Sequence, residues 1–145
     1  VRIFPESSSS TTRIIGTEGR DSVVWDKTLQ RYYFFIDGRR IVNTLGGDDI
    51  IGIDPDPYQA AHYGDTGPVF VKAGAGDDEI FVRNRTNLSF FSRIKGGPGF
   101  DSLYIQGYSS ADWTQKVRGA YVILEDSDSR TTLQVHRSIE EILPF

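Results

Sequence analysis

A short glycine–aspartate segment recurs four times in this 145-residue chain, each time with the same layout. A glycine stands two positions before an aspartate, and a branched aliphatic residue stands two positions after it. The fourth copy matches the pattern G-G-x-G-x-D-x-U, where U is aliphatic, and the first lacks only the second glycine. Such a repeat predicts equivalent structural units stacked on one another. The four copies are Gly16–Val23, Thr44–Ile51, Ala73–Ile80 and Gly96–Leu103.

Three hydrophobic columns accompany the segments when these are aligned on their aspartates. The apolar positions after each aspartate are two residues apart, which is the period of a strand with one buried face. Each unit is therefore predicted to run as a strand, a tight glycine turn and a second strand. The columns are Ile14, Val42, Val71 and Ile94; Val23, Ile51, Ile80 and Leu103; and Trp25, Ile53, Val82 and Ile105.

The spacing of the aspartates predicts an all-β solenoid. Successive aspartates are 28, 29 and 23 residues apart, a range typical of repeats that bury their faces on one another. We expect about four glycine-rich coils over residues 13–145, preceded by a Ser/Thr-rich linker or extension at 1–12. A decayed fifth coil is expected to start at Val117–Gly119. The strands 121–124 and 132–135 would follow as a capping hairpin, and residues 138–143 would close the stack.

Composition excludes several classes of protein. The net charge is −4 and the pI is about 5.1, which argues against a nucleic-acid-binding protein. No run of 18 apolar residues is present, so no transmembrane helix is expected. The chain has no cysteine, which excludes disulfides and thiolate metal sites. It also has no methionine, even at position 1, so we expect it to be part of a longer or processed protein.

The glycine and aspartate positions are suited to a hard cation. One column is glycine in every copy, and glycine accepts the backbone angles that aim carbonyl oxygens inward. Calcium takes six to eight oxygen ligands at about 2.3–2.6 Å. One turn offers two or three carbonyls and one carboxylate, so two stacked turns would complete a shell. The glycines of this column are Gly19, Gly47, Gly76 and Gly99.

Electrostatics predict that the stack needs a cation. Strand spacing would place equivalent aspartates about 4.8 Å apart. At that distance two carboxylates repel by ~3.5 kcal/mol at an effective dielectric of 20, and by ~0.9 kcal/mol in water. The whole domain is stable by only about 5–15 kcal/mol. The metal-free chain is therefore predicted to be marginally stable or unfolded.

The repeat resembles the RTX (repeats-in-toxin, hemolysin-type) calcium-binding modules of secreted bacterial proteins. The resemblance implies a right-handed parallel β-roll or β-helix, fused to another domain, that folds outside the cell at millimolar calcium. It also implies carboxylate ligands at the four aspartates and carbonyl ligands from the glycine-rich turns. The implied metal site residues are Asp21, Asp49, Asp78, Asp101, Gly16, Gly19, Gly47, Gly74, Gly76, Gly97 and Gly99.

This chain departs from the family pattern in ways that change the expected site. Each long coil carries one motif, which predicts a single column of at most three ions between four turns. Leu45 replaces a glycine and is expected to be strained, so the first inter-coil site is the least secure. Asp48 and Asp77 occupy a variable motif position and are expected to face solvent.

The remaining candidate residues support no enzyme. His62 and His136 are too isolated for a zinc site or a catalytic triad, and Asp54/Asp56 and Asp126/Asp128 are expected to be turn residues. We therefore expect a non-catalytic calcium-dependent folding module. The alternative is a carbohydrate-binding or adhesion module that uses exposed aromatic side chains, with Tyr33, Phe35 and Trp113 as candidates.

Overall fold

A computed structural model of the chain describes residues 2–5, 12–20, 22–23, 40–53, 69–82, 92–127 and 132–145. Over these ranges the protein is all-β, as predicted, and its strands form two sheets. No helix in this part of the chain is long and apolar enough to cross a membrane. The expectations for Trp25 and for residues 31–38 and 54–68 lie outside the described residues.

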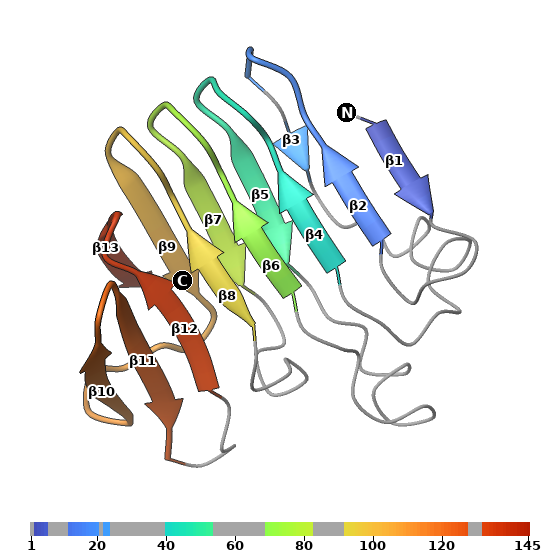
Figure 1. The fold of residues 1–145 in the computed structure, drawn as a ribbon. Helices are drawn as coiled ribbons and strands as arrows, with labels where there is room; N and C mark the ends of the chain where they lie inside the picture. Colours follow the sequence, from blue (N-terminus) through green and yellow to red (C-terminus); the bar gives the residue numbers. More distant parts are fainter. Residues whose placement is uncertain are drawn as a thin grey trace.

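The larger sheet has eight strands and the smaller sheet has five (Figure 1). In spatial order the eight-stranded sheet contains β1 (Arg2–Pro5), β2 (Thr12–Ile15), β4 (Arg40–Asn43), β6 (Val69–Lys72), β8 (Arg93–Lys95), β12 (Thr132–His136), β11 (Tyr121–Asp126) and β10 (Trp113–Arg118). The five-stranded sheet contains β13 (Ile139–Pro144), β9 (Asp101–Ile105), β7 (Glu79–Val82), β5 (Ile50–Ile53) and β3 (Ser22–Val23).

The strand register confirms the hydrophobic columns predicted from the repeat. Strands β2, β4, β6 and β8 pair in parallel, so that Val71 lies opposite Val42 on one side and Ile94 on the other. Strands β3, β5, β7 and β9 also pair in parallel, with Ile80 between Ile51 and Leu103. Each glycine–aspartate segment therefore connects one strand of the larger sheet to one strand of the smaller sheet.

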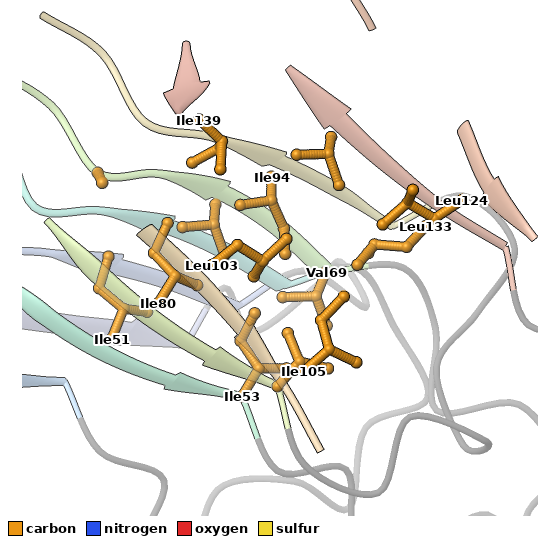
Figure 2. Packing of buried hydrophobic residues seen from close by; sticks show 14 of the residues in the cluster. Ile51, Ile53, Val69, Ile80, Ile94, Leu103, Ile105, Leu124, Leu133 and Ile139 are labelled. Atoms are coloured by element: carbon orange, nitrogen blue, oxygen red, sulfur yellow. The ribbon is translucent and has the colours of Figure 1, made fainter. Parts of the chain in front are cut away.

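The inward-facing side chains of the two sheets meet in one core (Figure 2). Ile51, Ile80 and Leu103 are fully buried, and Ile94 faces them from the larger sheet. Leu124 of β11 and Leu133 of β12 extend the same cluster to the C-terminal strands (Figure 2). The core holds the successive strand–turn–strand units in register, because a slip by one residue would expose a whole column.

The C-terminal region contains a fifth strand–turn–strand unit, but at a later position than predicted. Strand β12 pairs in parallel with β8, and β13 pairs in parallel with β9. The expected start at Val117–Gly119 is wrong, because these residues end β10 and begin the turn of the antiparallel β10–β11 hairpin. Gly119 has a φ of 59°, which suits this two-residue turn. The strands of the expected capping hairpin are β11 and β12.

At the other end of the larger sheet, β1 pairs antiparallel with β2. The strand β1 lies within residues 1–12, which the sequence predicts to be an extension. Residues 6–11 of that stretch lie outside the described part of the chain.

Candidate metal centre

The four glycine-rich turns lie side by side along one edge of the two sheets (Figure 1). Backbone hydrogen bonds join adjacent turns directly. The Gly47 N–H donates to the Ala75 carbonyl at 2.7 Å, and the Gly76 N–H donates to the Pro98 carbonyl at 2.9 Å. The turns are therefore stacked as closely as the strands that they connect.

The glycine common to all four segments makes this close approach possible. Gly76 has a φ of 135° and Gly99 a φ of 140°, which side chains rarely allow. A Cβ atom on Gly76 would overlap the carbonyl of Gly47, and one on Gly99 would overlap the carbonyl of Gly76. The carbonyl oxygens of these turns thus face the next turn, as a cation site between turns would require.

Leu45 is strained, as predicted from its place in the motif. Its φ is 71°, whereas the equivalent residue of the next turn is Gly74, with a φ of 116°. A left-handed backbone costs a residue with a side chain about 1–2 kcal/mol. Leu45 is 38% exposed, so burial of the rest of the residue offsets part of this cost.

The predicted aspartates form a buried column directly behind the turns. Asp49, Asp78 and Asp101 expose 1% or less of their surface. The Asp49 N–H donates to Oδ1 of Asp78 at 2.9 Å, and the Asp78 N–H donates to Oδ1 of Asp101 at 3.2 Å. Each carboxylate therefore contacts the backbone of the preceding unit. Asp21, the fourth predicted ligand, lies outside the described residues.

Burial in the column raises the pKa of two of its carboxyl groups, those of Asp78 and Asp101. Burial is the main cause of the rise in the pKa of Asp78 from 3.8 to about 6, and the charges of Asp101 and Asp49 add to it. Burial also raises the pKa of Asp101, although hydrogen bonds from the N–H groups of Asp78 and Gly97 oppose the rise. Ionised carboxylates are thus disfavoured here in the absence of a compensating positive charge.

Glu140 ends the column, which the sequence analysis did not anticipate. Its Oε2 accepts a hydrogen bond of 2.7 Å from the Asp101 N–H, as the next aspartate would if the motif continued. Ile139 lies opposite Asp101, and the register shifts between Ile139 and Glu141. This β-bulge brings the side chain of Glu140 to the Asp101 backbone. Glu140 stands two residues before Ile142, the register partner of Leu103, just as Asp101 stands two residues before Leu103, and this spacing was the available sequence signal.

Asp48 and Asp77 are exposed, as predicted, but they form a second row of hydrogen bonds. The Asp77 N–H donates to Oδ1 of Asp48 at 3.0 Å, and the Phe100 N–H donates to Oδ1 of Asp77 at 2.8 Å. In this outer row each carboxylate contacts the following unit, whereas the buried carboxylates contact the preceding one. Both rows tie the turns together, and the outer row does so in contact with solvent.

The donor atoms present fit a hard cation such as calcium. Oδ2 of Asp78 is buried and accepts no hydrogen bond from the described residues. By contrast, Oδ2 of Asp101 accepts a hydrogen bond of 2.8 Å from the Gly97 N–H. No group of three or more acidic or histidine side chains in the described ranges could hold a metal alone. A cation at this edge would therefore need carbonyl oxygens of the turns as well as carboxylates.

The other predicted glycines lie in the same turns. The Gly16 N–H donates to the Asn43 carbonyl at 2.8 Å, and the Gly19 N–H donates to Oγ1 of Thr17 at 3.2 Å. A Cβ atom on Gly97 would overlap the carbonyl of Gly74. The structure thus brings together all the predicted site residues that it describes.

Among the minor expectations, the structure contradicts those for Asp126 and Trp113 and gives His136 a local partner. Nδ1 of His136 lies 3.0 Å from Oγ of Ser138, within a turn. Asp126 is not a turn residue, because it is buried at the end of β11. Trp113 is also buried, at 4% exposure, so it is wrong as a sugar-stacking residue. The remaining candidates, His62, Asp54, Asp56, Asp128, Tyr33 and Phe35, lie outside the described residues.

Comparison of the chain with protein-family models, curated proteins and solved structures found no match in any of the three.

Proposed function

We propose that this chain is a calcium-binding folding module of a larger secreted bacterial protein, of the kind that the RTX resemblance implies. In this proposal the strand–turn–strand units are coils of a right-handed parallel β-solenoid. The parallel pairing and the aligned columns support it. Each coil would close through residues 24–39, 54–68 or 83–91, which lie outside the described part of the chain.

The observation that carries the proposal is the buried column of carboxylates. A buried and unpaired carboxylate costs free energy, and proteins place such groups beside a cation or protonate them. Asp78 has the most unfavourable position, with a charged neighbour on each side and one oxygen that accepts no hydrogen bond from the described residues. A divalent cation would convert this repulsion into coordination.

The turns suggest which atoms would serve as ligands. Carboxylate oxygens of Asp49, Asp78 and Asp101 would bind on the protein side of each gap between turns. Carbonyl oxygens of the glycine-rich turns, such as those of Gly47 and Gly76, would complete the shell. Asp21 would contribute to the first gap, so that four turns would hold at most three ions in one column.

Calcium binding and folding would be coupled in this module. The unfolded chain has no preformed site, so the free energy of binding becomes free energy of folding. In a low-calcium cytosol the chain would remain unfolded or marginally stable, and millimolar calcium outside the cell would fold it. Calcium would neutralise the negative charge of the aspartates, and the folded chain would place the oxygen ligands around the ion.

A calcium titration of the metal-stripped protein tests the proposal. Far-UV circular dichroism should change from a largely disordered signal to a β signal as calcium reaches millimolar concentration. Asp78→Ala should raise the calcium midpoint by at least tenfold, because the residue borders two gaps. Asp77→Asn is the control, since Asp77 is adjacent but exposed and the amide oxygen keeps the hydrogen bond from the Phe100 N–H, and its midpoint should change less than threefold.

Two results would contradict the proposal. One is cooperative melting of the metal-free chain at a high temperature that calcium does not change. The other is an equal change in midpoint for the Asp78 and Asp77 variants, which would reject the assignment of the buried column as the ligands.

A further inference from the structure

The outer face of the eight-stranded sheet carries basic side chains in two adjacent rows. Because side chains alternate along a strand, residues two apart share a face. Lys72 and Lys95 are register partners on β6 and β8, and Phe70 and Arg93 are partners in the neighbouring row. Both lysines and Arg93 are exposed, whereas Val71 and Ile94 between them point into the core.

The rows continue across the C-terminal strands. On β12, the uncharged Gln134 lies opposite Arg93, and its Oε1 accepts a hydrogen bond of 3.1 Å from the Arg93 Nε–H. On β10, the exposed residues Lys116 and Arg118 lie opposite Ile123 and Tyr121, on the face away from the buried Leu124. Arg137, in the turn after β12, is also exposed. We call the set Lys72, Arg93, Lys95, Lys116, Arg118 and Arg137 the basic face.

Little negative charge compensates this face. Glu125 pairs with Lys116 at 2.8 Å. Among the described residues, no carboxylate forms an ion pair with Lys72, Lys95 or Arg137. The pKa of His136 is lowered by burial and by the charges of Lys95 and Arg137, which is consistent with a positive potential around β12. A chain with a net charge of −4 thus gathers six cations on one surface, of which Lys116 forms an ion pair.

We propose that the basic face binds a linear acidic polysaccharide. Its carboxylate or sulfate groups would pair with Lys72, Lys95 and Arg93, which lie on neighbouring strands about 4.8 Å apart. Two partly buried aromatic rings, those of Tyr121 and Phe70, border the cations. The ring of Tyr121 lies 5.9 Å from the Arg93 guanidinium carbon, and Phe70 is half-buried beside Arg93.

The distribution of charge favours a single narrow chain over a broader polyanion. The turn edge next to Lys72 and Lys95 is acidic, with Asp48 and Asp77 exposed. A nucleic-acid duplex or an anionic membrane would spread its phosphates toward these groups. A single polysaccharide chain is narrow enough to contact the two rows of basic side chains without reaching the acidic turn edge. This site is separate from the turn edge, so the proposal stands independently of the calcium column.

Binding can be measured with a fluorescently labelled oligogalacturonate of defined length. The probe is kept too short for calcium to cross-link it, and it is titrated into the full chain at one fixed free calcium concentration that keeps the fold constant. Fluorescence anisotropy should show salt-sensitive binding, with no binding of an uncharged oligosaccharide of the same length. A labelled sulfated oligosaccharide should bind to the same face and compete with the first probe.

Matched variants locate the site. Lys95→Gln should weaken binding about fivefold and Lys72→Gln/Lys95→Gln further, as expected for exposed charge pairs. Arg20→Gln removes an exposed cation at the turn edge and should change the Kd by less than twofold. Far-UV circular dichroism should be unchanged in all three. Equal losses for Lys95→Gln and Arg20→Gln, or tighter binding of single-stranded DNA or anionic vesicles, would overturn the proposal.

Discussion

The four glycine-rich turns and the fifth turn connect equivalent strands by different chemistry. Strands β12 and β13 pair in parallel with β8 and β9, just as the earlier units pair with one another. Yet their turn has no glycine–aspartate motif, and Ile139 lies opposite Asp101. The hydrophobic columns are therefore enough to stack the strands. The glycines and aspartates are needed for something else, namely close turns and a buried column of carboxylates.

The difference also shows how the carboxylate column ends. The backbone N–H of each described aspartate in the column donates a hydrogen bond to a carboxylate of the next unit. In the fifth unit Glu140 provides that acceptor from an exposed position. The contact between the fourth and fifth units is thereby made by an exposed carboxylate, and no further buried charge is added.

The largest expected effect tests the need for glycine in the motif turns. Gly76→Ala would force a Cβ atom into the carbonyl of Gly47 at a φ of 135°. We expect a loss of about 3 kcal/mol or more in the free energy of unfolding, measured by urea denaturation in calcium. Ser138→Ala, in the fifth turn, should cost about 1 kcal/mol or less. A loss of about 1 kcal/mol or less in Gly76→Ala would show that the motif turn accepts a Cβ atom and does not need glycine.

The next effect concerns the pH dependence of the metal-free fold. The pKa of Asp78 is about 6 in the folded protein, above its value of 3.8 when unperturbed. The folded state therefore holds more protons between these pH values, so Asp78 makes stability fall as pH rises from about 4 to 6. The contribution is at most about 3 kcal/mol, and it is fully lost above about pH 7.

Asp78→Asn isolates this contribution from other titrating groups. The pKa of His136 is lowered, so His136 acts in the opposite direction as pH falls below about 6.5. Without metal, the variant should be more stable than the parent at pH 7.5 and nearly equal to it at pH 4. Far-UV circular dichroism with a chelator measures the folded fraction of both proteins, because the parent is expected to be largely disordered without metal at pH 7.5. A variant that is less stable than the parent at pH 7.5 would contradict the burial of an uncompensated charge.

A smaller effect tests the end of the column. Glu140→Gln keeps an acceptor for the Asp101 N–H but removes its charge, and Glu140→Ala removes the acceptor. We expect losses of about 0.5 and 1.5 kcal/mol in denaturation experiments. Glu141→Ala is the control, because Glu141 is exposed on the neighbouring position, and it should change stability by less than 0.5 kcal/mol, as is usual for surface sites.

The smallest effect distinguishes the second motif turn from the third. Leu45→Gly removes the strain of a φ of 71°, but glycine adds conformational entropy to the unfolded chain. The net gain should be about 0.5 kcal/mol, seen as a higher melting temperature. Gly74→Ala, at the equivalent position, should instead destabilise the protein, since its Cβ atom would overlap the Leu45 carbonyl. A loss of stability in Leu45→Gly would mean that the leucine side chain contributes more by packing than its backbone costs.

Much of the fold was predictable because the repeat carries its own register. Aligning four aspartates placed Val42, Val71 and Ile94 in one column, and parallel pairing then follows from burying that column. The stacking of Asp49, Asp78 and Asp101 in one column followed in the same way, whereas their burial was not predicted. The fifth unit was misplaced because it has no aspartate to align, and a hairpin glycine at position 119 resembled a motif remnant.

Local pattern alone determined the all-β class, the strand–turn–strand units, the columns and the identity of the buried carboxylates, because each depends on spacing along the chain. The tertiary structure decided which atoms meet between units. Only the register across a β-bulge brings Glu140 to the Asp101 N–H. Only the pairing of β12 with β8, and of β11 and β10 beyond it, brings Lys116 and Arg118 to the same face as Lys72 and Lys95, because the β10–β11 hairpin has no motif to align. Such contacts depend on how separate segments pack, and no spacing within one segment encodes that.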